Sequence, residues 1–157
     1  MQKFHNVEIG GATLHDVEQI EKLLEKEVEK GVILYRSTDE IAQNIRSYII
    51  AKIGNEIVGV VSLYIYSKEL SEFRSLFVSE NIRKSGVGRK LIQHGIEIGK
   101  NLGLKEFLVL TYKKDFFLKL GFYEIEKSEI PNGKIWADCV KCQYFPVCDE
   151  VALLFKA

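Results

Sequence analysis

With 157 residues, of which 46% are hydrophobic and 28% are charged, the chain has the composition of one soluble globular domain with its own core. The 22 lysines and arginines balance 22 aspartates and glutamates, and this zero net charge excludes the basic excess on which nucleic-acid binding depends. No apolar run approaches the length of a membrane span and the first residues do not resemble a signal peptide, so we expect a cytoplasmic protein without a membrane partner.

Two helix starts are visible in the first third of the chain. Thr13–Asp16 has the Ser/Thr-x-x-acid pattern of a capping box, and apolar residues at helical spacing follow it as far as Gly31. Ser37–Glu40 repeats the pattern and predicts a second, shorter helix. Gly31 itself is typical of a residue that ends a helix.

Six apolar segments predict strands. They comprise residues 7–9, 48–53, 57–65, 73–78, 107–111 and 122–125. Gly54-Asn55-Glu56 predicts a hairpin turn, a long amphipathic helix precedes Gly103, and a short helix precedes Gly121. The order β-α-α-β-β-β-α-β-α-β predicts an α/β fold with a mixed, mostly antiparallel sheet. We expect a single domain over 1–157, with a core of about 3–126 and an extension of about 127–157.

The most informative segment lies between the strand 73–78 and the long helix. It reads Arg83-Lys84-Ser85-Gly86-Val87-Gly88-Arg89. Glycines at a strand-to-helix junction let the backbone turn tightly and aim several N–H groups at one point. The start of the helix adds unpaired N–H groups and the positive end of its dipole. With three cationic side chains around it, this segment predicts a pyrophosphate site.

The glycine spacing distinguishes between phosphate-binding motifs. A nucleotide P-loop requires Lys-Ser/Thr after its last glycine, and a dinucleotide fingerprint requires a third glycine where Leu91 stands. The spacing Arg-x-x-Gly-x-Gly instead resembles the acyl-CoA signature of the GCN5-related N-acetyltransferase (GNAT) superfamily. For the motif alone, a basic loop that merely caps a helix remains the alternative.

The resemblance extends beyond this motif. The element order and the segment Phe117–Phe122 are similar to the GNAT fold from about Lys3 to Ile125. Other segments resemble the acetyltransferase domain of bacterial N-acetylglutamate synthases and the ending of their short stand-alone members; these segments are 31–37, 72–78, 107–112, 116–122 and 134–150. The resemblance implies an acetyl-CoA-dependent enzyme that acetylates the α-amine of L-glutamate in arginine biosynthesis. Another amino acid or small amine as acceptor, or a non-catalytic acyl-CoA sensor, remain alternatives.

The resemblance also implies catalytic roles. It places the general base at Glu72, at the start of the strand that leads into the segment 83–89, here called the glycine loop. A plain surface glutamate is the alternative reading, and Glu69 is the second candidate for the base. The backbone N–H groups of Leu76, Phe77 and Val78 are expected to hold the thioester oxygen as its charge develops.

A general acid is less well defined. Many GNAT members place a tyrosine where this chain has Phe117. Tyr112, just past the apolar strand 107–111, is the remaining candidate for the acid, or else an ordinary aromatic residue at a strand end.

Arg36 and Ser37 are the candidates for substrate binding. The planar fork of arginine pairs with both oxygens of a carboxylate, and Arg36 directly precedes the second capping box. Asp39 and Glu40 partly offset the field of that helix start. Arg36 therefore favours an acidic acceptor, whereas a strongly acidic pocket would favour another amine.

All three cysteines, Cys139, Cys142 and Cys148, lie near the end of the chain. A stable disulfide is not expected in a cytosolic protein, and a closed zinc site requires a fourth ligand. We therefore expect packed apolar thiols and no metal, with zinc as the first alternative and a redox switch as the second. A small-molecule amine and acetyl-CoA are the expected partners, and a homodimer is possible by analogy with relatives.

Overall fold

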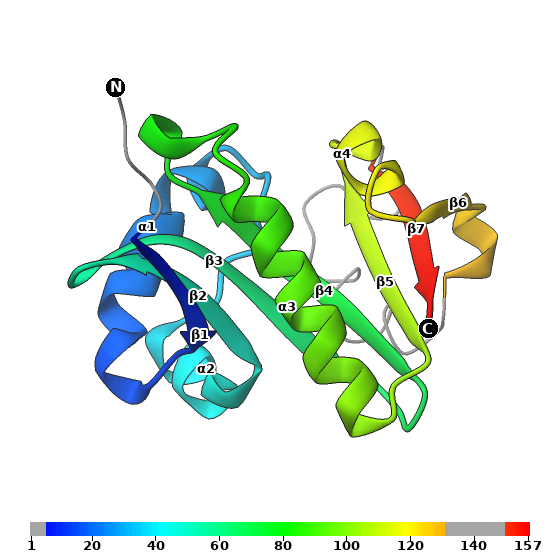
Figure 1. The fold of residues 1–157 in the computed structure, drawn as a ribbon, viewed down its shortest axis with the longest axis horizontal. Helices are drawn as coiled ribbons and strands as arrows, with labels where there is room; N and C mark the ends of the chain where they lie inside the picture. The colour runs from blue at the N-terminus through cyan, green and yellow to red at the C-terminus, as the bar shows by residue number, and fades with distance from the viewer. Residues whose placement is uncertain (1–5, 131–149) are drawn as a thin grey trace. The chain divides into compact units, whose positions relative to one another are not determined.

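The computed structural model describes residues 6–130 and 150–157. Its seven strands form one mixed sheet in the order β1-β2-β3-β4-β5-β7-β6 (Figure 1). The strands are β1 Val7–Gly11, β2 Tyr48–Ile53, β3 Glu56–Ile65, β4 Leu70–Val78, β5 Glu106–Thr111, β6 Tyr123–Ile125 and β7 Val151–Lys156. The helices are α1 Val17–Glu29, α2 Thr38–Gln43, α3 Val87–Leu102 and α4 Lys114–Leu118. The predicted α/β class with a mostly antiparallel sheet is confirmed.

The structure adds one strand to the predicted order. β7 pairs antiparallel with both β5 and β6, and its residues belong to the segment that the sequence analysis treated as an extension. β4 and β5 are parallel, as expected for two strands joined by a crossing helix. No described helix has the length and apolarity needed to cross a lipid bilayer.

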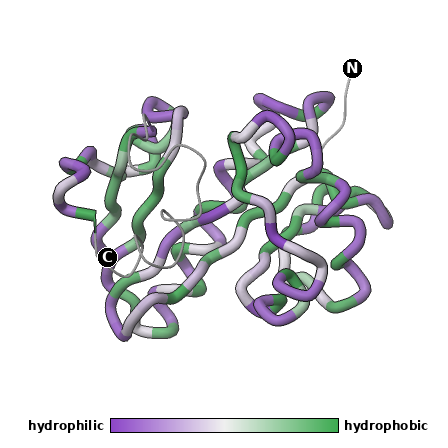
Figure 2. Tube along the Cα trace, turned by 180° about the vertical axis from the view of Figure 1, so that it is seen from behind, coloured by the Kyte–Doolittle hydropathy of each residue, from purple (hydrophilic) through white to green (hydrophobic). Residues whose placement is uncertain are grey.

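The described chain divides into two compact units. The first contains residues up to Leu63 together with Phe73–Ile98, and the second contains Tyr64–Glu72 together with the residues from Gly99 onward. Strand β4 and helix α3 each contribute residues to both units. Figure 2 shows hydrophobic residues along the strands and hydrophilic residues in the turns.

In the first unit, helices cover both faces of the sheet. Tyr48 and Ile50 of β2 belong to the core cluster that α1 and α2 complete with Ile20, Leu24 and Ile41. Ile49 and Ala51 alternate with them and reach the opposite face, where residues of α3 pack. Burial on both faces explains why the whole segment from Tyr48 to Ala51 is buried.

Helix α3 approaches the sheet closely because glycines face it. A Cβ atom on Gly95 would lie 2.4 Å from a ring carbon of Phe73, a separation that real Cβ atoms do not adopt. In the second unit, a Cβ on Gly99 would meet the ring of Phe107 at 2.4 Å. The two glycines, four residues apart on one helix face, thus provide the space for two buried aromatic rings.

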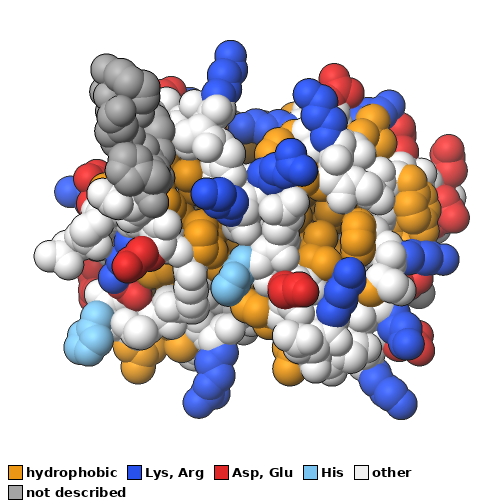
Figure 3. Space-filling model, in the orientation of Figure 1, with side chains coloured by type: hydrophobic (Ala, Val, Ile, Leu, Met, Phe, Trp, Pro, Cys, Tyr) orange, Lys and Arg blue, Asp and Glu red, His pale blue; other side chains and the backbone are white. Residues whose placement is uncertain are grey.

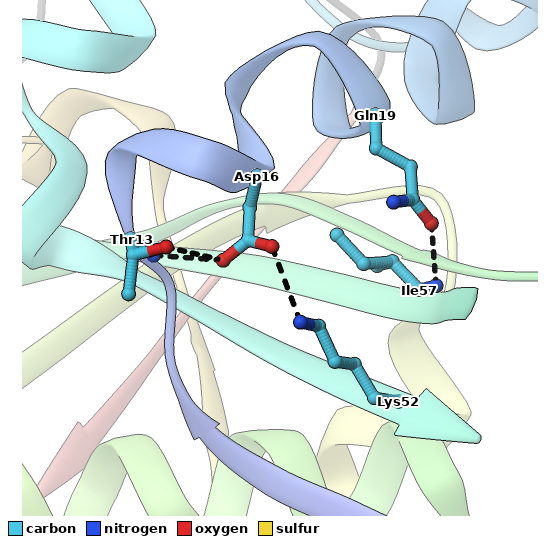
Figure 4. Close-up of polar contacts among 5 residues, drawn as sticks. All are labelled: Thr13, Asp16, Gln19, Lys52 and Ile57. Atoms are coloured by element: carbon cyan, nitrogen blue, oxygen red, sulfur yellow. Dashed lines mark hydrogen bonds and ion pairs between the residues drawn. The ribbon is translucent and has the colours of Figure 1, made fainter. Parts of the chain in front are cut away.

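A bulge in β3 connects the sheet to α1 and to the glycine loop. The register between β2 and β3 shifts after the pair Ala51–Gly59, which leaves Val58 as the extra residue. The Gln19 side chain of α1 accepts a hydrogen bond from the Ile57 N–H at 2.7 Å (Figure 4), and the Val58 carbonyl accepts one from the Ser79 N–H at 2.8 Å. The bulge therefore fixes the chain where β4 leads into the loop.

The second unit is built around β5. Phe107 and Leu108 of this strand are fully buried, and Phe107 contacts Phe155 of β7 edge to face at 6.0 Å. Phe122 packs against the rings of Phe117 and Phe155 at 5.1 and 5.4 Å. These aromatic contacts hold α4 and the following strand β6 against β7.

Candidate active site

The loop between β4 and α3 has the backbone geometry of an anion cradle. Lys84 and Gly86 both adopt left-handed conformations, with φ of 68° and 92°. Lys90 N–H bonds to the Gly86 carbonyl at 3.1 Å, so the N–H groups of Val87, Gly88 and Arg89 lie ahead of the helical ladder. Alternating left-handed residues before a helix start create a concave array of N–H donors.

The surroundings of the loop fit a diphosphate. A Cβ on Gly86 would meet no atom within 4 Å, so a ligand has open space beside this backbone. Lys84 and Arg89 are exposed, and lysine and arginine side chains gather on the face that α3 covers (Figure 3). Amide donors, a helix dipole and mobile cations are the groups that bind phosphates in proteins.

Arg83 and Ser85 are partly engaged within the loop. The Arg83 Nε donates to the Val78 carbonyl at 2.9 Å, and its guanidinium lies 5.2 Å from the centre of the Phe77 ring. The N–H and the hydroxyl of Ser85 both donate to the Ile82 carbonyl. These bonds hold the loop in its turn, and they bring Arg83 together with two of the residues predicted to hold the thioester oxygen.

Strand β4 contains a feature that the sequence analysis missed. Ser75 has a φ of 58° in the middle of the strand, a conformation that side-chain-bearing residues rarely adopt. Such a residue interrupts the regular alternation of side chains along a strand. The residues that follow it on β4 are Leu76, Phe77 and Val78, the predicted donors to the thioester oxygen.

Glu72 is buried in the second unit and hydrogen-bonded to Tyr66. Only 2% of its surface is exposed, and the Tyr66 hydroxyl donates to its Oε1 at 2.6 Å. Its backbone is paired in parallel with Leu108 of β5, and the neighbouring Ser71 hydroxyl donates to the Glu106 carbonyl at 3.0 Å. A buried glutamate with a fixed partner suits a positioned base far better than the exposed Glu69 does.

The two positions considered for a general acid differ in exposure. Phe117 is 1% exposed and lies in an aromatic cluster, so the place of the family's tyrosine is filled by a core residue. Tyr112 follows β5 and is 48% exposed. Lys114, the first residue of α4, forms an ion pair with Glu124 of β6 at 2.8 Å, and the hydrogen bond and charge of Glu124 raise the pKa of Lys114.

Arg36 lines a cavity of about 560 Å³ in the first unit. Tyr48 of β2 and Ser75 of β4 line the same cavity, so the structure brings Arg36 together with the distorted part of β4. The Ser37 hydroxyl accepts the Glu40 N–H at 3.1 Å and thus caps α2 as predicted. The wall formed by α1 is acidic, with Glu18, Glu21, Glu25 and Glu29.

The predicted site residues are thus divided between the two units. The glycine loop, Arg36 and the distorted segment of β4 belong to the first, while Glu72 and Tyr112 belong to the second, as does Tyr66, the hydrogen-bond partner of Glu72. β4 carries both Glu72 and Ser75, three residues apart. The cysteine cluster lies outside the described residues.

Comparison with known proteins identifies the family. The model of the Acetyltransferase (GNAT) family matches residues 14–123. An uncharacterized N-acetyltransferase of Chlorobaculum tepidum is 34% identical over 146 residues, which cover 93% of this chain and 94% of that protein. An amino-acid acetyltransferase of Vibrio cholerae is 26% identical over 81% of this chain, which spans only 29% of that protein.

Solved structures agree on the fold. The N-acetylglutamate synthase of Neisseria gonorrhoeae, complexed with coenzyme A and N-acetyl-glutamate, superposes with a TM-score of 0.84 at 21% identity, over 99% of this chain and 36% of that one. A Mycobacterium tuberculosis protein in complex with CoA superposes with a TM-score of 0.82 at 18% identity, over 96% and 99%. The chain therefore belongs to the Acetyltransferase (GNAT) family, and it is an N-acetyltransferase that uses acetyl-CoA as cosubstrate.

Proposed function

We propose that the protein acetylates the α-amine of an amino acid, with L-glutamate as the acceptor, in the manner of an N-acetylglutamate synthase of arginine biosynthesis. The observation that carries this proposal is the cavity that Arg36 shares with Ser75, because Ser75 directly precedes the predicted oxyanion donors on β4. An acceptor carboxylate on Arg36 would be anchored in the cavity that β4 borders. Relatives named amino-acid acetyltransferases support the same class of acceptor.

The proposed reaction needs few groups from the protein. Glu72 takes a proton from the acceptor ammonium, directly or through a water, and the free amine attacks the thioester carbon. Backbone N–H groups after Ser75 stabilise the developing oxyanion, and the glycine loop holds the diphosphate of the cosubstrate. The C–S bond then breaks and the CoA thiolate leaves, while the nitrogen of the new amide gives its second proton to the thiolate or to water. Since a thiol has a pKa of about 8.5, the thiolate leaves without strong help from an acid.

A second acceptor class is favoured by the charge of the cavity wall. Four glutamates of α1 line the cavity, against Lys22 and Arg36 as the lining cations. An acidic wall attracts cations and repels a second carboxylate. This favours an acceptor with a distal cationic group, such as a basic amino acid or a polyamine, in place of glutamate.

A thiol-release assay with acetyl-CoA distinguishes the two classes. The purified chain is assayed with glutamate, glutamine, lysine, arginine and spermidine at equal concentration. Glutamate as the best acceptor supports the synthase proposal. A preference for lysine, arginine or spermidine that falls in the Glu21→Gln variant supports the second class and overturns glutamate. Absence of thiol release with every acceptor contradicts the amino-acid assignment as a whole.

A further inference from the structure

Tyr66 is the partner of the buried carboxylate. It directly follows β3 in the turn to β4, where its N–H donates to the Leu70 carbonyl at 2.9 Å. This backbone bond and an edge-to-face contact with Tyr64, with ring centres 5.0 Å apart, define the position of its ring. From there the hydroxyl reaches Oε1 of Glu72 at 2.6 Å.

The length of this hydrogen bond indicates a strong interaction. A distance of 2.6 Å is in the range of a hydroxyl that donates to a charged carboxylate. The Glu72 carboxylate is only 2% exposed, so little water is available to replace a lost hydrogen-bond donor. The Tyr66 hydroxyl therefore contributes strongly to the solvation of this carboxylate. The hydroxyl also fixes one carboxylate oxygen and thus the plane in which the group accepts a proton.

We propose that Tyr66 is the positioning residue of the general base, holding Glu72 as an oriented carboxylate ready to accept the proton of the acceptor ammonium. This inference rests on the proposed function, in which Glu72 is the base. Tyr66 stays protonated throughout: the proton passes from the ammonium to Glu72, and the Tyr66 O–H remains the donor. Tyr66 acts through Glu72 and touches no reacting atom in this scheme.

The test compares Tyr66→Phe, Glu72→Gln and the double variant, with whichever acceptor the wild type uses. We expect Tyr66→Phe to lower kcat about ten- to a hundredfold, which is less than the full contribution of a positioned general base. The acceptor KM should change less than about twofold. In the Glu72→Gln background, Tyr66→Phe should have no further effect, since both variants remove the same function.

Tyr123→Phe is the matched control, because it removes a phenol hydroxyl from an exposed strand of the same unit. It should leave both kcat and the acceptor KM unchanged. A Tyr66→Phe variant with wild-type kcat, beside an inactive Glu72→Gln, overturns the role of Tyr66 alone. Effects that multiply in the double variant show that Tyr66 acts independently of Glu72 and likewise overturn the inference. Full activity of Glu72→Gln instead overturns the assignment of the base in the proposed function.

Discussion

At the scale of single residues, two charged side chains show how surroundings decide a role. Arg36 is half-buried on the wall of a cavity, where its guanidinium can meet a ligand. Asp16 is 5% exposed and engaged inside the protein: Lys52 Nζ lies 3.3 Å from its Oδ1, and the Thr13 N–H donates to its Oδ2 at 2.8 Å (Figure 4). These surroundings assign Asp16 to stability, and they are the reason why Arg36 is the residue proposed to bind the acceptor.

Arg36→Met should raise the KM of a carboxylate-bearing acceptor far more than that of acetyl-CoA. The methionine keeps much of the apolar stem and removes the charged fork, and a lost charge-assisted pair costs about 1.5–3 kcal/mol, or roughly ten- to a hundredfold in KM. Steady-state kinetics with each substrate varied in turn provide the measurement. Arg46→Met, an exposed arginine that does not line the cavity, serves as the control. Equal changes in both KM values would remove the role of Arg36 in acceptor binding.

Asp16→Asn should destabilise the protein at neutral pH and less so in acid. Burial by itself would raise the pKa of Asp16, but the hydrogen bonds from Thr13 and the hydrogen bond and charge of Lys52 outweigh it and lower this pKa below 3.8. The carboxylate therefore stabilises the fold fully above pH 3.8, and this contribution disappears as the pH falls through the lowered pKa.

Urea unfolding at pH 7 should show a loss of about 1–3 kcal/mol for Asp16→Asn, and the difference from wild type should shrink at pH 3. Glu56→Gln, at an exposed hairpin position, is the control and should change the unfolding free energy by less than about 0.5 kcal/mol. A difference that is the same at both pH values would mean that the charge of Asp16 contributes nothing.

At the scale of elements, the residues of helix α3 favour close packing against the sheet at the expense of helix propensity. Glycine is about 1 kcal/mol worse than alanine inside a helix, and α3 nevertheless carries Gly95 and Gly99 on the face toward the sheet. The rings of Phe73 and Phe107 occupy the space that Cβ atoms would need. The loss in propensity is offset by two fully buried aromatic side chains.

Gly95→Ala should therefore lower the stability although alanine favours helices. Its Cβ would overlap the Phe73 ring, which is 2% exposed and has little room to move, and overpacking of this kind costs about 1–3 kcal/mol. Thermal unfolding measures the change, with Gln93→Ala on the exposed side of the same helix as control. Phe73→Leu should cost less in the Gly95→Ala background than alone. A raised Tm for Gly95→Ala would contradict the packing argument.

At the scale of the whole molecule, cosubstrate binding is coupled to folding. A ligand that binds only the native protein shifts the folding equilibrium of the entire chain. The glycine loop is a local structure, but the bulge at Val58 and the N-terminus of α3 hold its two ends. Its donors are therefore aligned only when the protein is folded.

Acetyl-CoA should raise the unfolding free energy by about 2.7 kcal/mol at a hundred times its Kd. Gly86→Ala should weaken this effect, because alanine disfavours a φ of 92° and adds a methyl group beside the N–H donors. Gly54→Ala is the matched control: its φ of 62° and open surroundings are similar, but it lies in the β2–β3 turn. Both variants should be less stable, and only Gly86→Ala should show a smaller shift in Tm with acetyl-CoA. Equal shifts in the two variants would exclude the loop as the binding site.

The sequence by itself determined most of the local structure and the motif that indicates the family. The capping boxes at Thr13 and Ser37 and the hairpin turn at Gly54 were predicted correctly, because each is specified by residues within one or two turns of chain. The Arg-x-x-Gly-x-Gly segment indicated the family that the comparison confirms, and its role in phosphate binding stays a prediction.

Only the tertiary structure decided which side chains meet. It inserted β7 between β5 and β6, gave Ser75 a left-handed conformation, and placed the Tyr66 hydroxyl on Glu72. It also gave the cavity that Arg36 lines an acidic wall of glutamates, which is why a second acceptor class enters the proposal. These features depend on strand pairing, on packing across the sheet and on the path of a hairpin. None of these is encoded in a local sequence pattern that could be recognised before the fold is known.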